Sequence, residues 1–338
     1  MRIRVDAVDP GTMQAIRDIT AVVESSSSNV VEQDISDDLV YSGRIAYAGN
    51  ATWLAGLVRI SAEHDDGSVD VLGTFFATPD AGQHTGTLYR GDVQLDGVLL
   101  ALQSTRTTAT YVAGRGTNAI DVIRDGCVAA GRATSIDSNL AAGRYAETIV
   151  YEAGTDWLTI CIEAAERSGM RLTQDRMGYV AVEPIDANRA ERQIWNAAAR
   201  ATDITSEITR SDARYAAATR VIATYGDAEN SIAATAESER GPHDAQTSGR
   251  KRDVAISVSD MVIPSIAELT SRAQEELDRQ LGSDEWSFDC LYRIANAGDA
   301  ATIYDPSEQA QLDGIVSHTS ISLDGLLRMS VSVQGSIR

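Results

Sequence analysis

Histidine has the widest chemical range of any side chain, because imidazole both binds metals and transfers protons near neutral pH. The chain holds four, and no two stand at i and i+4 or at a zinc-type spacing: His64, His84, His243 and His318. The segment His64-Asp65-Asp66-Gly67 falls between two predicted strands. Asp and Gly are typical of turns, so we interpret it as a turn, with a metal site as the alternative.

Other patterns that could carry chemistry are incomplete. The acidic segment 34–38 lacks the glycine and the spacing of a calcium loop. Gly114-x-Gly116 precedes a predicted helix without the third glycine of a dinucleotide fingerprint, which indicates a helix entry turn. Ser26, Ser42 and Ser135 have no nucleophile elbow around them. Carboxylates are plentiful, but sequence alone does not place two of them across a glycosidic bond. We therefore predict no catalytic, metal-binding or cofactor-binding residue, no cofactor and no enzyme.

One basic cluster stands out in an acidic chain. A polar, aperiodic segment at 238–252 has Arg240 near its start and the run Arg250-Lys251-Arg252 at its end. Such a segment is typical of an exposed loop. Its basic end is either an ordinary charged loop or a docking point for an acidic partner. Asn50-Ala51-Thr52 also forms a glycosylation sequon, a triplet that often arises by chance.

The charge of the chain is strongly one-sided. The 338 residues carry a formal net charge of −20, with 31 Asp, 18 Glu and a single lysine, Lys251, among 29 basic residues. A GC-rich genome favours Arg over Lys. Molar salt favours a dense carboxylate surface, since it screens self-repulsion. The excess of Asp favours the second explanation, and we expect a haloarchaeal source. This acidity argues against nucleic-acid binding through a basic face.

Length and composition set the general class of the chain. A chain of 338 residues suggests two or three domains, and 43% hydrophobic residues supply ordinary cores. No apolar run approaches the roughly 18 residues of a membrane span, and residues 1–20 lack the apolar region of a signal peptide. Cys127, Cys161 and Cys290 are far apart, and we interpret them as small buried hydrophobes.

The sequence pattern in the first third of the chain predicts β-structure. Short apolar runs of four to ten residues are bounded by Gly, Asp, Asn or Pro, a pattern typical of an antiparallel barrel or sandwich. We predict a first β-barrel domain at 1–108. Its strands are expected at 1–8, within 29–47, and at 53–60, 69–77, 85–94 and 98–102.

Helical spacing begins after residue 108. We predict a helix that starts at an N-cap on Thr117, buries Ala119, Ile120, Ile123, Cys127 and Val128, and stops at Gly131. A second helix is predicted from a cap on Thr155 to Gly169, with Leu158, Cys161, Ile162 and Ala165 buried. A hairpin follows around Asp175–Gly178. These elements define an α/β insertion domain at 109–189.

Strands return after Pro184. They are predicted at 203–211, 218–225, 231–237, 254–258, 285–291, 301–304, 314–323 and 327–334. A capping box, Ser265 with Glu268, begins a helix that ends at Gly282, and we expect this helix to pack on the insertion domain. Asp324-Gly325 predicts a hairpin turn. A second β-barrel domain is therefore predicted at 190–262 and 284–338.

The order of these features resembles one known family. The segments that carry the resemblance are SGRIAYAG, WLAGLVRISAE, DVLGTFFAT, GTLYRGDVQLDGVLLAL, the GTDWLTICIEAAERSGM unit with its hairpin, SIAELTSRAQEELDRQL and GIVSHTSISLDGLLRMSVSVQG. Together they resemble the baseplate or tail-tip hub family of tailed viruses, related to the late control protein D type. Each segment is degenerate by itself, so the resemblance lies in the order.

The resemblance implies a structural protein of the virion tail tip. Two β-barrels per chain would let a homotrimer form a ring of pseudo-sixfold symmetry, which joins a sixfold tail tube or distal tail ring to a threefold tip. The implied partners are the tube or distal tail protein, the tape measure protein and tip, spike or receptor-binding proteins. Viral DNA would pass the acidic lumen during genome ejection without specific binding. The alternative is a carbohydrate-binding or carbohydrate-active β-scaffold protein of a halophile.

Overall fold

The protein is described by a computed structural model. The structure describes residues 2–50, 56–80, 82–136, 143–145, 147–184, 192–197, 203–211, 218–226, 231–238, 252–257, 265–281, 284–324 and 327–337. Contacts between residues divide the chain into two units. Unit 1 comprises Met1–Asp186, Cys290–Gly298 and Ser317–Val331, and unit 2 comprises Ala187–Asp289, Asp299–Val316 and Ser332–Arg338.

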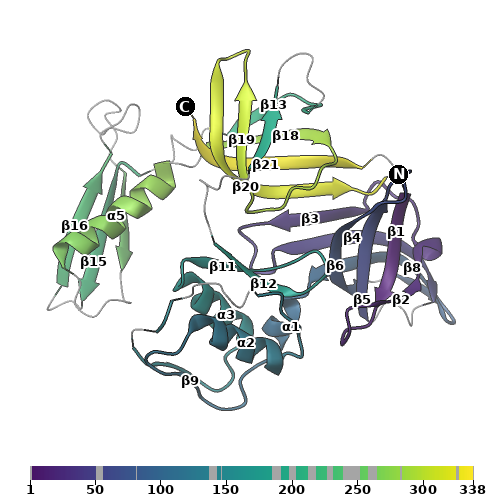
Figure 1. Cartoon of the computed structure of the whole chain (residues 1–338), viewed down its shortest axis with the longest axis horizontal. Helices are drawn as coiled ribbons and strands as arrows, with labels where there is room; N and C mark the ends of the chain where they lie inside the picture. The colour runs from purple at the N-terminus through teal and green to yellow at the C-terminus, as the bar shows by residue number, and fades with distance from the viewer. Residues whose placement is uncertain are drawn as a thin grey trace. The chain divides into compact units, whose positions relative to one another are not determined.

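Unit 1 contains an antiparallel sheet whose order is β20-β3-β4-β8-β6-β5-β1-β2 (Figure 1). Apolar side chains alternate toward one face, so Val31, Ile45, Ile60 and Phe75 are buried. The strands are β1 (Arg2–Val8), β2 (Ala15–Asp18), β3 (Val30–Asp34), β4 (Tyr41–Asn50), β5 (Gly56–Glu63), β6 (Val69–Pro79), β7 (Gln83–Thr85), β8 (Leu88–Gly97) and β20 (Ala310–Ser322), of which Ser317–Ser322 lies in this unit.

The segment after β2 hydrogen-bonds to two strands that are not neighbours in the sheet order. It includes the short 3-10 helix η1 (Thr20–Val22). The Ile19 N–H donates to the Val5 carbonyl of β1, and the Glu24 N–H donates to the Ala46 carbonyl of β4, each at 2.8–2.9 Å. A bridge between Val23 and Tyr47 adds to the second contact. Backbone bonding therefore runs from β1 through this segment to β4.

The segment that the sequence predicts as an insertion domain also lies in unit 1, and we keep that name for its elements. Its elements are β9 (Tyr111–Ala113), α2 (Ala119–Ala129), β10 (Ile149–Tyr151), α3 (Trp157–Glu166), β11 (Met170–Gln174) and β12 (Val180–Pro184). The hairpin predicted around Asp175–Gly178 is confirmed, with Gly178 at φ +88° as its positive-φ residue. Both predicted helix stops are confirmed as well, since Gly131 and Gly169 have φ of +63° and +66°.

The two predicted N-caps were each wrong by one residue. α2 is capped by Asn118, whose Oδ1 accepts the Ile120 N–H at 2.9 Å, and α3 is capped by Asp156, whose Oδ1 accepts the Thr159 N–H at 2.8 Å. Asn and Asp cap helices better than the preceding Thr117 and Thr155 do.

Three further sequence predictions in this unit and the next need correction. Residues 98–102 were predicted as a strand, but they enter the helix α1 (Leu100–Ser104). Val128 was predicted to be buried and is 79% exposed. Within 203–211, only β14 (Thr209–Ser211) is a strand among the residues that the structure describes.

Unit 2 contains a sheet with the strand order β14-β18-β21-β20. β19 pairs with β20 in the antiparallel direction, and β13 pairs with β19 in the parallel direction. Buried aromatic residues form its core, and the rings of Trp195 and Phe288 meet edge to face at 5.4 Å. The strands are β13 (Gln193–Asn196), β18 (Asp284–Leu291), β19 (Ala300–Asp305), β20 and β21 (Arg328–Ile337); β18, β20 and β21 are divided between the units.

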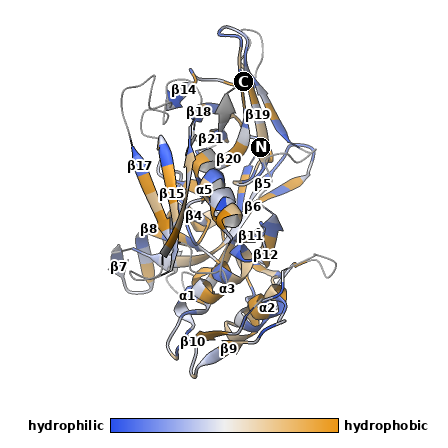
Figure 2. Cartoon of the chain, turned by 90° about the vertical axis from the view of Figure 1, so that its left-hand side faces the viewer, coloured by the Kyte–Doolittle hydropathy of each residue, from blue (hydrophilic) through white to orange (hydrophobic). Residues whose placement is uncertain are grey.

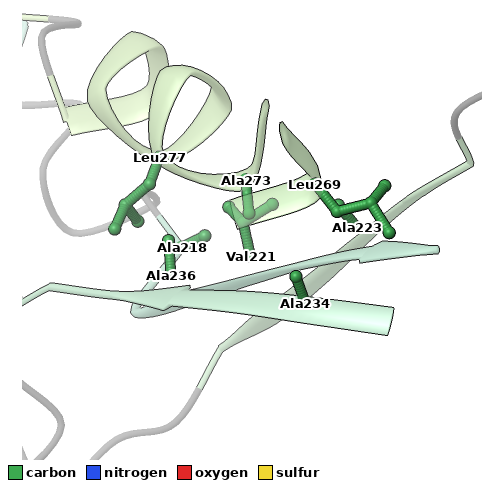
Figure 3. Close-up of a cluster of buried hydrophobic side chains, with 8 residues drawn as sticks. All are labelled: Ala218, Val221, Ala223, Ala234, Ala236, Leu269, Ala273 and Leu277. Atoms are coloured by element: carbon green, nitrogen blue, oxygen red, sulfur yellow. The ribbon is translucent and has the colours of Figure 1, made fainter. Parts of the chain in front are cut away.

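A second, small sheet in unit 2 carries one helix. β15 (Arg220–Gly226) pairs with β16 (Ser231–Glu237) and with β17 (Asp253–Ser257), and α5 (Ile266–Leu281) packs on this sheet. We call these four elements the α5 unit. Figure 3 shows Leu269, Ala273 and Leu277 of α5 directed at the small side chains of β15 and β16. The buried face of α5 therefore packs on this sheet. We had expected α5 to pack on the insertion domain instead.

The fold is a β-rich α+β fold, as the sequence predicted. The three cysteines are free and buried, which confirms their interpretation as core residues. Burial raises the pKa of the Cys127 thiol to about 12. The described part of the chain contains no helix that could cross a membrane. The Gly325 position of the predicted C-terminal turn lies outside the described residues.

Candidate functional site

Among the residues that the structure describes, those that the sequence offered for chemistry do not form a common site. His64 Nε2 lies 2.8 Å from Asp70 Oδ2 in a turn closed by the Gly67 N–H on the His64 carbonyl, which confirms the turn interpretation. His318 faces Asp34 on a neighbouring strand, at 3.5 Å. Within the described ranges, no three His, Cys, Asp or Glu side chains are grouped so as to hold a metal ion. The Gly114-x-Gly116 segment is the helix entry turn that was predicted, with Gly116 at φ +85°.

The candidate docking loop at 238–252 is described only at its two terminal residues, Ser238 and Arg252. Arg240, Arg250 and Lys251 lie outside the described residues, as does most of the sequon at Asn50. Arg252 is exposed, and its N–H donates to Thr219 Oγ1 at 2.8 Å just before β17. The docking role of this loop stays a prediction.

The turn of the β11–β12 hairpin carries a connected polar site in unit 1. Arg176, in this turn, donates from Nε to Asn296 Oδ1 at 2.8 Å and from Nη2 to the Ala295 carbonyl at 3.1 Å. Its Nη1 reaches the Val71 carbonyl of β6 at 3.3 Å and the Tyr292 hydroxyl at 3.4 Å. A single guanidinium therefore joins the insertion domain to β6 and to the segment 290–298. We call this site the hairpin junction.

A second arginine meets the same turn from the sheet. Arg59 of β5 is buried, and its Nη2 donates to the carbonyls of Met177 and Met13 at 3.0 and 2.9 Å. Its Nε donates to Thr74 Oγ1, which in turn donates to the Arg176 carbonyl. Burial lowers the pKa of Arg59, because a charged group loses solvation there. These bonds offset that cost and fix the hairpin turn on β5 and β6.

A buried glutamine completes the junction. The Gln174 Nε2 donates to the Thr74 carbonyl at 3.0 Å, and its Oε1 accepts the Val98 N–H just before α1. The space is tight: a Cβ on Gly97 would lie 2.8 Å from Gln174 Oε1, and one on Gly178 would lie 2.6 Å from the Met13 methyl. Two glycines are therefore required for the close approach of hairpin and sheet.

The roles of Arg59, Gln174 and Arg176 were not predicted from the sequence. One signal was available: Arg59 interrupts the apolar run of β5, where a charged side chain needs partners. The chemistry of the junction is limited to donation from guanidinium and amide groups to carbonyl, amide and hydroxyl oxygens. It can orient one domain on another, and the contacts include no nucleophile held by a base.

In unit 2, Arg210 pairs with carboxylates, whereas Arg59 and Arg176 donate to neutral oxygens. Arg210 of β14 pairs with Asp305, and with Glu308 at 2.7 Å, and its guanidinium lies 4.3 Å from the centre of the Trp286 ring. Burial acts to raise the pKa of Asp305, but bonds from the Ser307 hydroxyl and N–H and the charge of Arg210 lower it on balance. This ion pair ties the edge strand β14 to the turn after β19.

The insertion domain exposes apolar side chains on its two-stranded ribbon. Val112 of β9 and Val150 of β10 are directly paired, and they are 53% and 59% exposed. Figure 2 shows this ribbon beside α2, and Figure 1 shows β9 in the same domain. The two valines therefore form a small exposed apolar patch on the ribbon.

Comparisons with known proteins bear on the fold. No protein-family model matches the chain. No curated protein matches it either. Among solved structures, the chain is similar to the 43 kDa tail protein of prophage MuSo2 from Shewanella oneidensis, at 11% identity and TM-score 0.68, with 98% of each chain covered.

Two further structures are similar over the whole chain. The tail protein from Neisseria meningitidis MC58 matches at 10% identity and TM-score 0.68, covering 99% of this chain and 97% of that one. The prophage tail protein gp18 from Listeria monocytogenes EGD-e matches at 10% identity and TM-score 0.57, covering 99% and 95%. The chain therefore has the fold of these tail proteins along nearly its entire length.

Proposed function

We propose that this chain is a structural, non-enzymatic protein of a virus tail, placed at the baseplate or tail tip. Three copies form a ring that joins a sixfold tail tube or distal tail ring to a threefold tip. The observation that carries the proposal is the fold shared with three tail proteins over 98–99% of the chain. A match of this extent includes the insertion domain and the α5 unit as well as the strands.

The bonding in the described strands supports a barrel in the first β-domain. The segment after β2 bonds to β1 on one side and to β4 on the other, and a sheet that closes on itself leaves no edge. We propose barrel domains near 1–108 and at 190–262 with 284–338, each one occupying a sixth of the ring. Six similar positions from three chains would match a hexameric tube.

The partners follow from this place in a tail. They are the tube or distal tail protein on one side, tip or receptor-binding proteins on the other, and the tape measure protein in the lumen. A net charge of −20 favours a lumen that repels DNA phosphates, so that ejected DNA passes without binding. The same acidity supports a haloarchaeal tailed virus as the source. The carbohydrate-binding alternative is not favoured by the comparisons.

The oligomeric state tests the ring. Light scattering after gel filtration, in 0.15 M and in molar salt, should give three times the chain mass of 36.1 kDa. Negative-stain images should show a central hole. A monomer under both conditions, with or without tube protein added, would exclude the ring. Turnover of a polysaccharide by the purified chain would overturn the non-enzymatic assignment.

A further inference from the structure

The ribbon formed by β9 and β10 has two unlike faces. On its inner face, the Tyr111 ring lies 4.8 Å from the Trp157 ring of α3, and its hydroxyl donates to Asp125 of α2 at 2.9 Å. The Tyr151 hydroxyl on the same face donates to Glu163 Oε2 of α3 at 3.0 Å. This face is therefore covered by the two helices of its own domain.

The outer face is left to solvent. Val112 and Val150 point there because side chains alternate along a strand, and direct pairing places them in mutual contact range. More than half of each side chain is exposed. A short two-stranded ribbon is also marginally stable by itself, so a cover on this face would add to its stability.

The charges around the ribbon differ from those of the whole chain. Arg106, Arg115 and Arg144 are exposed at its ends, and none of them forms an ion pair in the described structure. Two exposed glutamates, Glu147 and Glu152, lie in the same segments, together with the half-buried Asp156, whose backbone is bridged to Arg106. Three arginines against three carboxylates leave this surface neutral, whereas the chain carries −20. Two copies meeting through an average acidic surface would repel each other.

We propose that the outer face of the β9–β10 ribbon is a contact between copies of this chain, with Val112 and Val150 at its apolar centre. The inference rests on the homotrimer proposed above and names one surface that holds it together. The arginines at the ends of the ribbon find in the neighbouring copy the carboxylates that they lack in their own. A stable contact buries about 800 Å² per partner, so the two valines form the centre of a larger interface.

The first test compares two variants of the full chain with the wild type. Val112→Asp combined with Val150→Asp places two carboxylates at the centre of the contact, and it should weaken association by about 100-fold or more. Val128→Asp, on α2 of the same domain, is the matched control, because Val128 is 79% exposed and lies off the ribbon. Light scattering over a dilution series measures both, and circular dichroism checks that both variants are folded.

The outcomes distinguish a failure of the ribbon contact from a failure of the proposed trimer. A trimeric wild type with a dissociated ribbon variant and an intact Val128 variant supports the contact. A ribbon variant that stays trimeric overturns the contact and leaves the trimer standing. A wild type that is monomeric throughout overturns both.

A second test identifies the occupant. Val112→Cys gives a single accessible thiol among the described residues, since the native cysteines are buried. A photoactivated crosslinker on this thiol should join two copies, and mass spectrometry then maps the partner peptide. We expect crosslinks to an acidic segment of a second copy. Crosslinks confined to one chain, in a preparation that is trimeric, would contradict the proposal.

Discussion

The insertion domain and the α5 unit are both helix-on-sheet structures, but they are held in different ways. The insertion domain has large core residues such as Trp157, and Arg176 and Gln174 bond its hairpin to the neighbouring sheet. In the α5 unit, five of the eight buried core residues are alanine, which keeps α5 close to β15 and β16 but buries little area.

The difference shows what each kind of contact provides. Apolar packing is non-directional, so an alanine-rich layer gives modest stability and little control over orientation. Hydrogen bonds from a planar guanidinium require defined positions for their acceptors, so Arg176 fixes how the hairpin lies on β6 and on the segment 290–298. We infer that the insertion domain is held rigidly on its sheet and that the α5 unit is the weaker of the two structures.

The largest effect is expected in the α5 unit. Leu277→Ala removes one of its two buried leucines and should cost about 3 kcal/mol in the free energy of unfolding. Hydrogen exchange in β15 and β16 should accelerate, and exchange in β11 and β12 should not change. Ile266→Ala is the control on the same helix, since Ile266 is 65% exposed and its loss should cost under about 0.5 kcal/mol. Equal acceleration in both regions would refute their independence.

A somewhat smaller effect is expected at the hairpin junction. Arg176→Met keeps an aliphatic side chain and removes the donors to Asn296 and to the Ala295 and Val71 carbonyls, which should cost about 2 kcal/mol. Denaturant unfolding measures the loss. Arg124→Met is the control, because Arg124 is exposed and its side-chain partner in the described structure is Asp121 on the same helix. If both variants lose the same stability, the junction has no special role.

The helix caps allow a finer comparison within the insertion domain. Asp156→Ala removes the acceptor of the Thr159 N–H and should cost about 1 kcal/mol. Thr155→Ala removes an exposed bond to the Glu152 carbonyl, and we expect about 0.3 kcal/mol. Thermal unfolding of the two variants ranks them, and the reverse order would restore Thr155 as the cap.

The sequence predicted the elements of this protein better than their contacts. Local signals sufficed for the hairpin at Asp175–Gly178 and for both glycine helix stops, because turn and cap chemistry depends on neighbouring residues. Residues 98–102 were misread because a short apolar run has no period that separates helix from strand.

Long-range contacts could not be predicted from the sequence, for a different reason. Arg176 meets Asn296 across 120 residues, and no local pattern specifies such a pair. The partner of α5 was missed in the same way, since its apolar stripe shows that a face is buried and not what covers it.

The smallest predicted effect is a difference in pH dependence between the contacts of Arg176 and those of Arg210. The acceptors that face Arg176 are amide, carbonyl and hydroxyl oxygens, so the cost of Arg176→Met should not change between pH 7 and pH 3. Arg210 instead faces Asp305, whose pKa in the folded protein is below the ordinary 3.8. A depressed carboxyl pKa contributes stability above its unfolded value, and this stability is lost as pH falls through the folded value.

Asp305→Asn should therefore cost about 0.5 kcal/mol at pH 6, where the wild-type carboxylate is charged, and the difference should close as pH falls below about 4. The amide oxygen of the variant can still accept from Ser307, so the comparison isolates the charge. Denaturant unfolding at several pH values measures both variants side by side. A penalty for Asp305→Asn that persists unchanged at pH 3 would mean that the ion pair with Arg210 does not stabilise β14. A penalty for Arg176→Met that fell with pH would mean that a carboxylate, and not the neutral oxygens, supports the hairpin junction.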